Sequence, residues 1–91
     1  MKGDPRVSVV VLTHNRRREL LGTLERLQAL PERPRALVVD NGSTDGTAAA
    51  VARRFPGIHL IPLRRNLGAA GRNAGLLSAD TPYVALSDDD T

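Results

Sequence analysis

Residues 7–12, VSVVVL, form a nearly continuous run of aliphatic side chains that is interrupted by a single serine. Such a run is typical of a strand that is buried on both faces, as the strands of a parallel sheet are. Three further short strand-forming runs follow along the chain, at residues 35–40, 58–63 and 83–87. The first run therefore predicts a strand inside a parallel sheet, and the later runs predict its neighbours.

The first helix is expected after Asn15, whose side chain can cap its amino end. Leucines recur at helical spacing from Leu20 to Leu30, so that one apolar stripe can pack on the sheet. Pro31 follows this stripe and marks the end of the helix.

Two more helices complete an alternating pattern. We expect one at residues 47–54, capped by Ser43 or Thr44, and another at residues 69–78. The order β-α-β-α-β-α-β predicts an α/β fold, a Rossmann-like three-layer α/β/α arrangement with a mainly parallel sheet and right-handed crossovers. Because Pro62 has no backbone N–H, the third strand is expected at or near an edge of the sheet.

The composition limits the classes of function. The chain has 91 residues, a formal net charge of +3, 2% aromatic residues and no cysteine, so it forms one domain without disulfides or thiolate metal sites. Nucleic-acid binding is not expected, because basic residues interleaved with aromatic stacking platforms are missing. No apolar run approaches the roughly 20 residues of a membrane span. We expect a cytoplasmic location, with membrane association left open for a full-length protein.

Three consecutive carboxylates, Asp88, Asp89 and Asp90, follow the last predicted strand. Like charges this close together cost free energy unless a cation lies among them. A hard divalent cation such as Mg²⁺ or Mn²⁺ suits oxygen ligands, and two carboxylates spaced Asp-x-Asp can present it to a diphosphate. The alternative is a solvated turn at the end of the chain, and these residues alone leave both open.

Polar residues also lie at the ends of the earlier strands. Thr13 follows the first strand and Asp40 ends the second. Ligands of parallel α/β sheets sit at the carboxyl ends of the strands, near a switch in strand order, so these residues and the acidic tail are expected to converge. The carboxylate of Asp40 can accept a hydrogen bond from a base or a ribose hydroxyl, whereas residues 41–46 are explained largely by turn and cap chemistry.

Gly68, Gly71 and Gly75 lie three and four residues apart, which places them on one face of the expected third helix. Each costs up to about 1 kcal/mol relative to alanine inside a helix, so their repetition indicates the close approach of either a strand or a ligand. Arg72 lies beside them and can reach a phosphate or a base, with a solvated arginine as the alternative.

Four motifs thus follow one another along the chain, at residues 7–16, 38–47, 65–75 and 85–90. In this order they resemble the family 2 glycosyltransferases with the GT-A fold, over nearly the whole chain. The resemblance implies a transferase, usually inverting, that uses a UDP-, dTDP- or GDP-sugar with Mg²⁺ or Mn²⁺. Residues 1–91 resemble the donor-binding half of such a domain, truncated at its metal motif. The general base and the acceptor site are then expected further along, so we expect weak nucleotide binding and no transfer by these residues alone.

The resemblance also implies roles for individual residues. Asp40 would contact the base, and Asp88 would face the ribose or the sugar. Asp90 would ligate the metal together with Asp88, and Asp89 could exchange roles with either. The other substrate-binding positions that it implies are Thr13, Asn15, Gly42, Asn66, Gly68 and Arg72.

Three other hypotheses are compatible with an α/β fold of this order. A non-catalytic α/β fragment would bind nucleotide weakly or form a homo-oligomer through an exposed sheet edge. A signalling receiver domain would carry an acidic pair after its first strand, where this chain has Thr13, His14 and Asn15. A nucleotidyltransferase of related topology would carry a basic glycine-rich loop there, which is absent.

Overall fold

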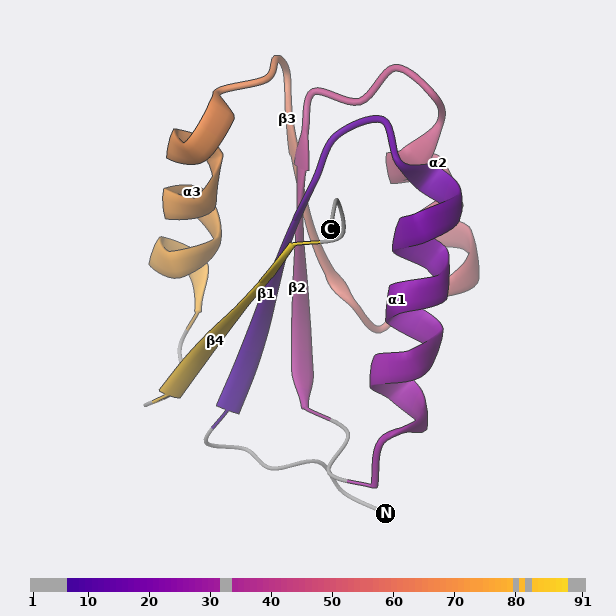
Figure 1. Ribbon diagram of the computed structural model, residues 1–91, viewed down its shortest axis with the longest axis vertical. Helices are drawn as coiled ribbons and strands as arrows, with labels where there is room; N and C mark the ends of the chain where they lie inside the picture. The colour runs from indigo at the N-terminus through magenta and orange to yellow at the C-terminus, as the bar shows by residue number, and fades with distance from the viewer. Residues whose placement is uncertain (1–6, 32–33, 80, 82, 89–91) are drawn as a thin grey trace.

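The computed structural model describes residues 7–31, 34–79, 81 and 83–88. Within these residues lie the strands β1 (Val7–Thr13), β2 (Arg35–Asn41), β3 (His59–Leu63) and β4 (Tyr83–Asp88), and the helices α1 (Arg17–Ala29), α2 (Thr47–Arg54) and α3 (Gly71–Ser78), with a 3₁₀ turn, η1 (Gly68–Ala70), before α3. The strands form a parallel sheet in the order β3-β2-β1-β4. The predicted α/β fold is confirmed, including its three layers (Figure 1).

The helices divide between the two faces of the sheet for a topological reason. The chain moves from β1 to β2 to β3 in one direction, and then crosses back past β2 and β1 to reach β4. Because crossovers between parallel strands are right-handed, α1 and α2 cover one face and α3 covers the other (Figure 1). The strand order switches between β1 and β4, which is where open α/β sheets bind ligands.

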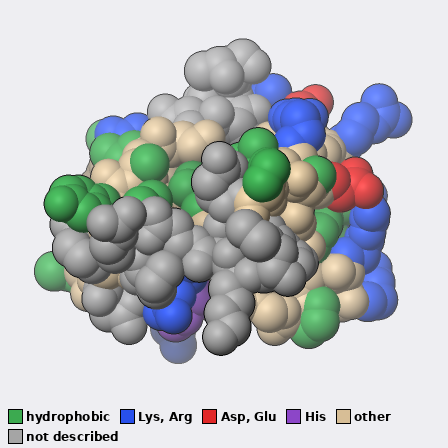
Figure 2. Space-filling view, turned by 90° about the horizontal axis from the view of Figure 1, so that it is seen from below, with side chains coloured by type: hydrophobic (Ala, Val, Ile, Leu, Met, Phe, Trp, Pro, Cys, Tyr) green, Lys and Arg blue, Asp and Glu red, His purple; other side chains and the backbone are tan. Residues whose placement is uncertain are grey.

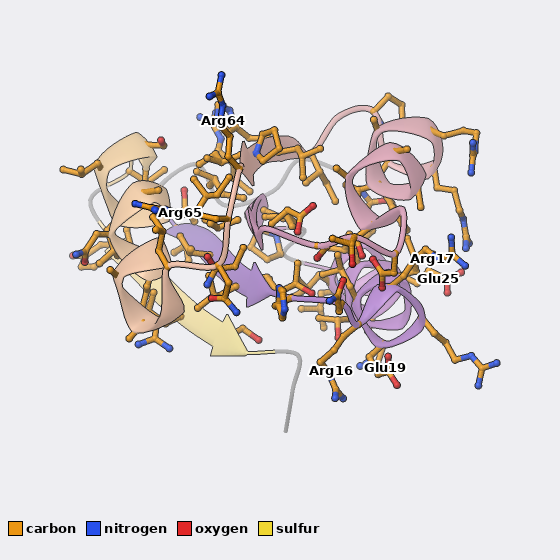
Figure 3. All side chains as sticks on the ribbon, turned by 90° about the horizontal axis from the view of Figure 1, so that it is seen from above. Arg16, Arg17, Glu19, Glu25, Arg64 and Arg65 are labelled. Carbon is orange, nitrogen blue, oxygen red and sulfur yellow. The ribbon has the colours of Figure 1, made fainter. Side chains whose placement is uncertain are left out.

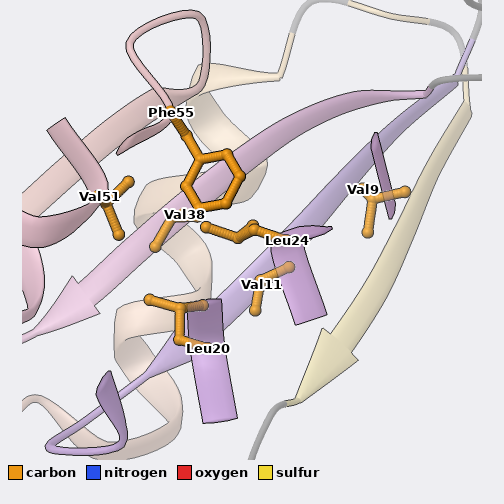
Figure 4. Packing of buried hydrophobic residues seen from close by; sticks show 7 residues of the cluster. All are labelled: Val9, Val11, Leu20, Leu24, Val38, Val51 and Phe55. Atoms are coloured by element: carbon orange, nitrogen blue, oxygen red, sulfur yellow. The ribbon is translucent and has the colours of Figure 1, made fainter. Parts of the chain in front are cut away.

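The apolar core follows from the alternation of side chains along β1. The larger cluster lies between the sheet and the pair α1 and α2 (Figure 4), and its buried members are Val9, Val11, Leu20, Leu24, Val38, Val51 and Phe55. A smaller cluster on the α3 side contains Val10, Leu37 and Val39. Because β1 contributes alternate residues to both clusters, it is buried on both faces, as its sequence predicts.

The expected edge position of the strand that contains Pro62 is also confirmed. Among the described strands, β3 pairs with β2 alone, in register Asp40 with Pro62. At the other edge, β4 pairs with β1 alone within the same part of the chain. None of the described helices is long and apolar enough to cross a membrane.

The helix caps differ from the sequence prediction. Asn15 does not cap α1, which begins at Arg17; it has a φ of +52°, and its Oδ1 accepts a hydrogen bond from Thr44 N at 2.7 Å. Neither Ser43 nor Thr44 caps α2. The Asp45 carboxylate instead accepts hydrogen bonds at the amino ends of both helices. For α2 it is a local partner, two residues before Thr47, whereas it reaches Arg17 at the start of α1 from the loop after β2.

Two details of the helices were also predicted wrongly. Leu30 lies outside α1, in extended conformation, and is 42% exposed, so the apolar stripe ends one turn earlier than expected. Gly68 does not share a helix face with Gly71 and Gly75, because it lies in η1 with a φ of +59°. That conformation favours glycine for reasons of backbone geometry alone.

Candidate functional site

The carboxyl ends of β1, β2 and β4 meet at one edge of the sheet. Thr13 of β1 stands in register with Asp40 of β2, and Leu12 stands in register with Asp88 of β4. Thr13 and Asp40 are buried. The structure therefore brings the predicted positions at the three strand ends together, on both sides of the point where the strand order switches.

Asp40 is a buried carboxylate that the following turn holds in place. Its Oδ1 accepts a hydrogen bond from Ser43 N at 3.0 Å, and its carbonyl oxygen accepts one from Gly42 N at 2.9 Å. A carboxylate with 3% of its surface exposed requires such partners, because burial of an unpaired charge is costly. The turn thereby fixes the carboxylate at the strand end where a ligand is expected.

Asn41 is the residue at this edge that the sequence analysis missed. It is 3% exposed, its Oδ1 accepts a hydrogen bond from Leu67 N at 2.8 Å, and its Nδ2 donates one to Gly68 O at 3.0 Å. Its carbonyl oxygen accepts a hydrogen bond from His14 Nδ1 at 2.7 Å. Because a carbonyl oxygen can only accept, Nδ1 is the ring nitrogen that carries the proton. An asparagine in a cluster of turn residues predicts only local turn chemistry, so the sequence held no signal for this role.

The loops after β1 and β2 are joined by Asn15. Its backbone N donates a hydrogen bond to Ser43 Oγ at 2.9 Å, and its Oδ1 accepts from Thr44 N at 2.7 Å. The side chain, predicted to bind substrate, is thus engaged in holding two loops together in this structure. Its Nδ2 donates to His14 Nε2 at 3.3 Å, which agrees with a proton on the other ring nitrogen.

The Asp45 carboxylate also joins these two loops, through the first residues of the helices that follow them. Its Oδ2 accepts a hydrogen bond from Arg17 N at 3.1 Å, and its Oδ1 accepts from Thr47 N at 3.1 Å and from the Thr47 hydroxyl. The Thr47 hydroxyl is the main cause that lowers the pKa of Asp45, with the backbone N–H groups of Arg17 and Thr47 acting in the same direction against partial burial. One carboxylate therefore serves the amino ends of two helices.

Three of the predicted binding residues, Gly42, Asn66 and Gly68, determine the conformation of the loop between β3 and η1. Gly42 has a φ of +73°, and a Cβ there would lie 2.5 Å from the backbone of Arg65 and Asn66. Asn66 Oδ1 accepts a hydrogen bond from Gly68 N at 2.7 Å, as in an Asx turn. Gly42 therefore has a structural reason to be glycine, and Asn66 and Gly68 are exposed parts of the loop.

The helix glycines allow α3 to approach the sheet closely. A Cβ on Gly75 would overlap Val10 Cγ1, and a Cβ on Gly71 would lie 2.9 Å from the Asn41 carboxamide. Of the two alternatives that the sequence left open, approach of a strand accounts for both glycines. Arg72, half-buried, follows Gly71 at the start of α3 on the same side of the sheet.

Arginines flank the strand ends. Figure 3 looks down on this edge: Arg16 and Arg17 lie on one side of it, at the start of α1, and Arg64 and Arg65 lie on the other, after β3. Arg17, Arg64 and Arg65 are exposed. Glu19 and Glu25 lie on the same side as Arg16 and Arg17, so the charge there is mixed, whereas Arg64 and Arg65 are adjacent cations that can attract anions such as phosphates. At the opposite end of the molecule, hydrophobic side chains gather on the side where α3 lies, and others lie toward the far side among charged side chains (Figure 2).

The predicted metal ligands lie largely outside the part of the chain that the structure describes. Asp89 and Asp90 fall outside the described residues, and Asp88 is described only as part of β4. Among residues 7–31, 34–79, 81 and 83–88, no three His, Cys, Asp or Glu side chains gather to hold a metal ion. A Mg²⁺ ion bound through substrate phosphates requires only one or two carboxylates, which is the number that an Asp-x-Asp pair supplies.

Comparison with known proteins adds to this geometry. Residues 8–91 match the family described as Glycosyl transferase family 2. An uncharacterized glycosyltransferase of Mycobacterium tuberculosis is 43% identical over 90 residues, which are 99% of this chain and 38% of that protein. An N-acetylglucosaminyl-diphospho-decaprenol L-rhamnosyltransferase of the same species is 43% identical over 61 residues, 66% of this chain and 20% of that protein.

A solved structure agrees with these relatives. The mannosyltransferase PcManGT from Pyrobaculum calidifontis, in complex with GDP-Man and Mn²⁺, is similar over 94% of this chain and 28% of its own, with a TM-score of 0.72 and 32% identity. The chain thus spans less than half the length of each of these proteins.

Proposed function

The chain belongs to glycosyl transferase family 2, and from this membership we propose that it supplies the donor-binding part of an enzyme that transfers a sugar from a nucleotide-diphosphate sugar. The observation that carries the proposal is the edge of the sheet where Thr13, Asp40 and β4 meet between flanking arginines. The similar mannosyltransferase holds GDP-Man and Mn²⁺, which supports a nucleotide sugar and a divalent metal as ligands. Membership of this family removes the receiver-domain and nucleotidyltransferase alternatives.

The described residues suggest which part of the nucleotide each of them would contact. We place the base of the nucleotide at Asp40, because its carboxylate is fixed by Ser43 at the end of a central strand. Arg65 and Arg72 approach from the loop and helix that follow β3, where guanidinium groups suit a diphosphate. Thr13 lies between Asp40 and the end of β4, so it would line the nucleoside pocket.

We propose Asp88 and Asp90 as ligands of Mg²⁺ or Mn²⁺. Carboxylate oxygens suit these hard cations. When bound, the metal supplies positive charge to a departing diphosphate. An inverting transfer further requires a base that takes a proton from the acceptor hydroxyl. The expectation that this base lies beyond Thr91 stays a prediction, as does the cytoplasmic location.

Titration calorimetry of the chain with UDP, GDP and dTDP, each with and without Mn²⁺, tests the proposal. We expect one nucleotide to bind, more tightly with Mn²⁺ than without it. Asp40→Asn should weaken that binding at least about tenfold, because a hydrogen bond to a charged group is worth roughly 1.5–3 kcal/mol. Asp90→Ala should abolish the effect of Mn²⁺.

Glu25→Gln is the matched control, since it removes one negative charge from an exposed position on α1 and should leave the affinity unchanged. Absence of binding by all three nucleotides would sink the donor-site proposal for this chain. So would binding that is indifferent to both Mn²⁺ and Asp40→Asn.

A second candidate is a non-catalytic module that self-associates. The large hydrophobic side chains that stay exposed are concentrated on α3 and β4: Leu76, Leu77, Tyr83, Val84 and Leu86. Because β4 pairs with β1 alone among the described strands, its outer edge offers unpaired backbone groups to another strand. We propose homo-oligomerisation through this edge as an activity of the chain alone.

A further inference from the structure

We propose that Asn41 is a positioning residue that fastens the loop before α3 to the carboxyl edge of the sheet, so that one wall of the nucleotide site is formed before the ligand arrives. The link to nucleotide affinity rests on the function proposed above. The positional claim itself stands on the contacts of Asn41 with three separate segments.

The Asn41 carboxamide matches the backbone of the loop at two points. Its Oδ1 accepts from Leu67 N at 2.8 Å, and its Nδ2 donates to Gly68 O at 3.0 Å. A primary amide offers one acceptor and one donor side by side, whereas a carboxylate offers acceptors alone. The pairing of an N–H with the next residue's C=O therefore selects an amide at this position.

Packing reinforces the two hydrogen bonds. A Cβ on Gly71 would lie 2.9 Å from both the Oδ1 and the Nδ2 of Asn41, so the first turn of α3 rests directly on the carboxamide. Next to it, Gly42 lies against the backbone of Arg65 and Asn66. Both ends of the segment from Arg65 to Gly71 are thus seated on the end of β2.

These contacts fix the backbone positions of two arginines of the proposed site. Arg65 lies in the seated loop, and Arg72 follows Gly71 on α3. The loop after β1 joins the same residue, because His14 Nδ1 donates to Asn41 O at 2.7 Å. Asn41 therefore connects the segments that follow β1, β2 and β3, and a site that is preorganised in this way loses less conformational freedom on binding.

Asn41→Asp is the discriminating variant, because it keeps the shape of the side chain and removes the donor to Gly68 O. At neutral pH the carboxylate faces a carbonyl oxygen, so we expect the loop to leave the sheet. Amide hydrogen exchange of Leu67 should become about tenfold faster, and the Kd of the nucleotide that binds wild type with Mn²⁺ should rise about tenfold. Loss of the hydrogen bond to Gly68 O, together with a carboxylate placed against that oxygen, implies an effect of this size. Gln28→Glu, the same change at an exposed position on α1, should alter neither quantity.

Lowering the pH supplies a rescue that general loss of stability would not give. A protonated Asp at position 41 can again donate to Gly68 O, so both quantities should return toward those of wild type measured at the same pH. The ionisable groups nearest to this position along the contacting segments are Asp40, His14, Arg65 and Arg72. Wild type contains the same groups, so comparison at equal pH removes their contribution.

The unmodified chain gives a second measurement. One side-chain amide proton of Asn41 should exchange with solvent more slowly than those of exposed Asn66 and Asn73. Equal rates would overturn the proposal, and so would a Leu67 exchange rate that Asn41→Asp leaves unchanged. A weaker Kd without faster Leu67 exchange would point to direct ligand contact and also overturn it. If wild type binds no nucleotide, the donor-site proposal fails, while the exchange measurements still decide the role of Asn41.

Discussion

Gly75 gives a sharp test of how closely α3 packs on the sheet. Gly75→Ala adds one methyl group inside a helix, which by itself stabilises a helix by about 1 kcal/mol. Here the new Cβ would overlap Val10 Cγ1 and lie 3.0 Å from Val39 Cγ2, two side chains that are almost fully buried. Restoring an ordinary carbon–carbon separation requires α3 to move away by about 1 Å. Overpacking of this kind costs roughly 1–3 kcal/mol, so the net effect runs from neutral to about 2 kcal/mol destabilising.

The chain contains its own control for the helix term. Gly22 lies inside α1, and a Cβ there would meet only the end of the Arg26 side chain, at 3.5 Å. Gly22→Ala should therefore stabilise the chain by about 1 kcal/mol. The gap between the two variants isolates the steric cost at position 75 and should reach about 1–3 kcal/mol, with each kcal/mol worth roughly 4–8 °C in Tm for a domain of this size.

Urea unfolding followed by circular dichroism measures both variants, with the m value as a check that the denatured states are comparable. The double variant Val10→Ala/Gly75→Ala should be destabilised less than the sum of the two single variants, by about 0.5–3 kcal/mol. The reason is that Val10→Ala removes the methyl groups that the new Cβ would overlap. If Gly75→Ala stabilises the chain as much as Gly22→Ala does, the claim that α3 packs closely on β1 at Gly75 is refuted.

Two further predictions concern the shared cap and the sheet edge. Because the folded chain lowers the pKa of Asp45 below its ordinary value of 3.8, chiefly through the Thr47 hydroxyl, the charged form stabilises the fold above that value, and the contribution is lost as the pH falls through the folded pKa. Asp45→Asn should therefore reduce the free energy of unfolding at neutral pH by about 0.5–2 kcal/mol and flatten its decline below pH 3.8; an unaltered acid limb in stepped-pH urea titrations would contradict this. If the outer edge of β4 mediates self-association, Leu86→Lys should lower the mass measured by light scattering, whereas Gln28→Lys on α1 should not. A wild-type chain that stays monomeric at every concentration would refute the edge as an interface.

Much of the fold was predictable because it depends on local patterns. The run at residues 7–12 could be buried on both faces only in the middle of a sheet, and Pro62 could not stand in a central strand. Alternation of strands and helices, together with the handedness of crossovers, then placed Thr13 and Asp40 at one edge. These inferences need no knowledge of which distant residues touch.

The parts that failed depend on contacts between loops. Asn15 and Thr44 each have the chemistry of a helix cap, but they bond to one another. Asp45, which is adjacent to α2 in the sequence, also accepts a hydrogen bond from Arg17 N at the start of α1, 28 residues away. Asn41 was overlooked for the same reason, since its partners at Leu67 and Gly68 are far away in sequence. Cap and turn preferences describe what a side chain can do nearby, whereas tertiary geometry decides which partner it takes.

The position of β1 in the sheet has a consequence for how the chain folds during synthesis. β1 is made first, yet one of its two neighbours is β4, so that Val7 pairs with Tyr83. At about 5–20 residues per second, the ribosome completes β2 and β3 seconds before β4 exists. During that interval one side of the most apolar strand has no partner. A nascent chain of this topology therefore passes through a stage at which β1 is the segment most open to a chaperone or to a wrong strand.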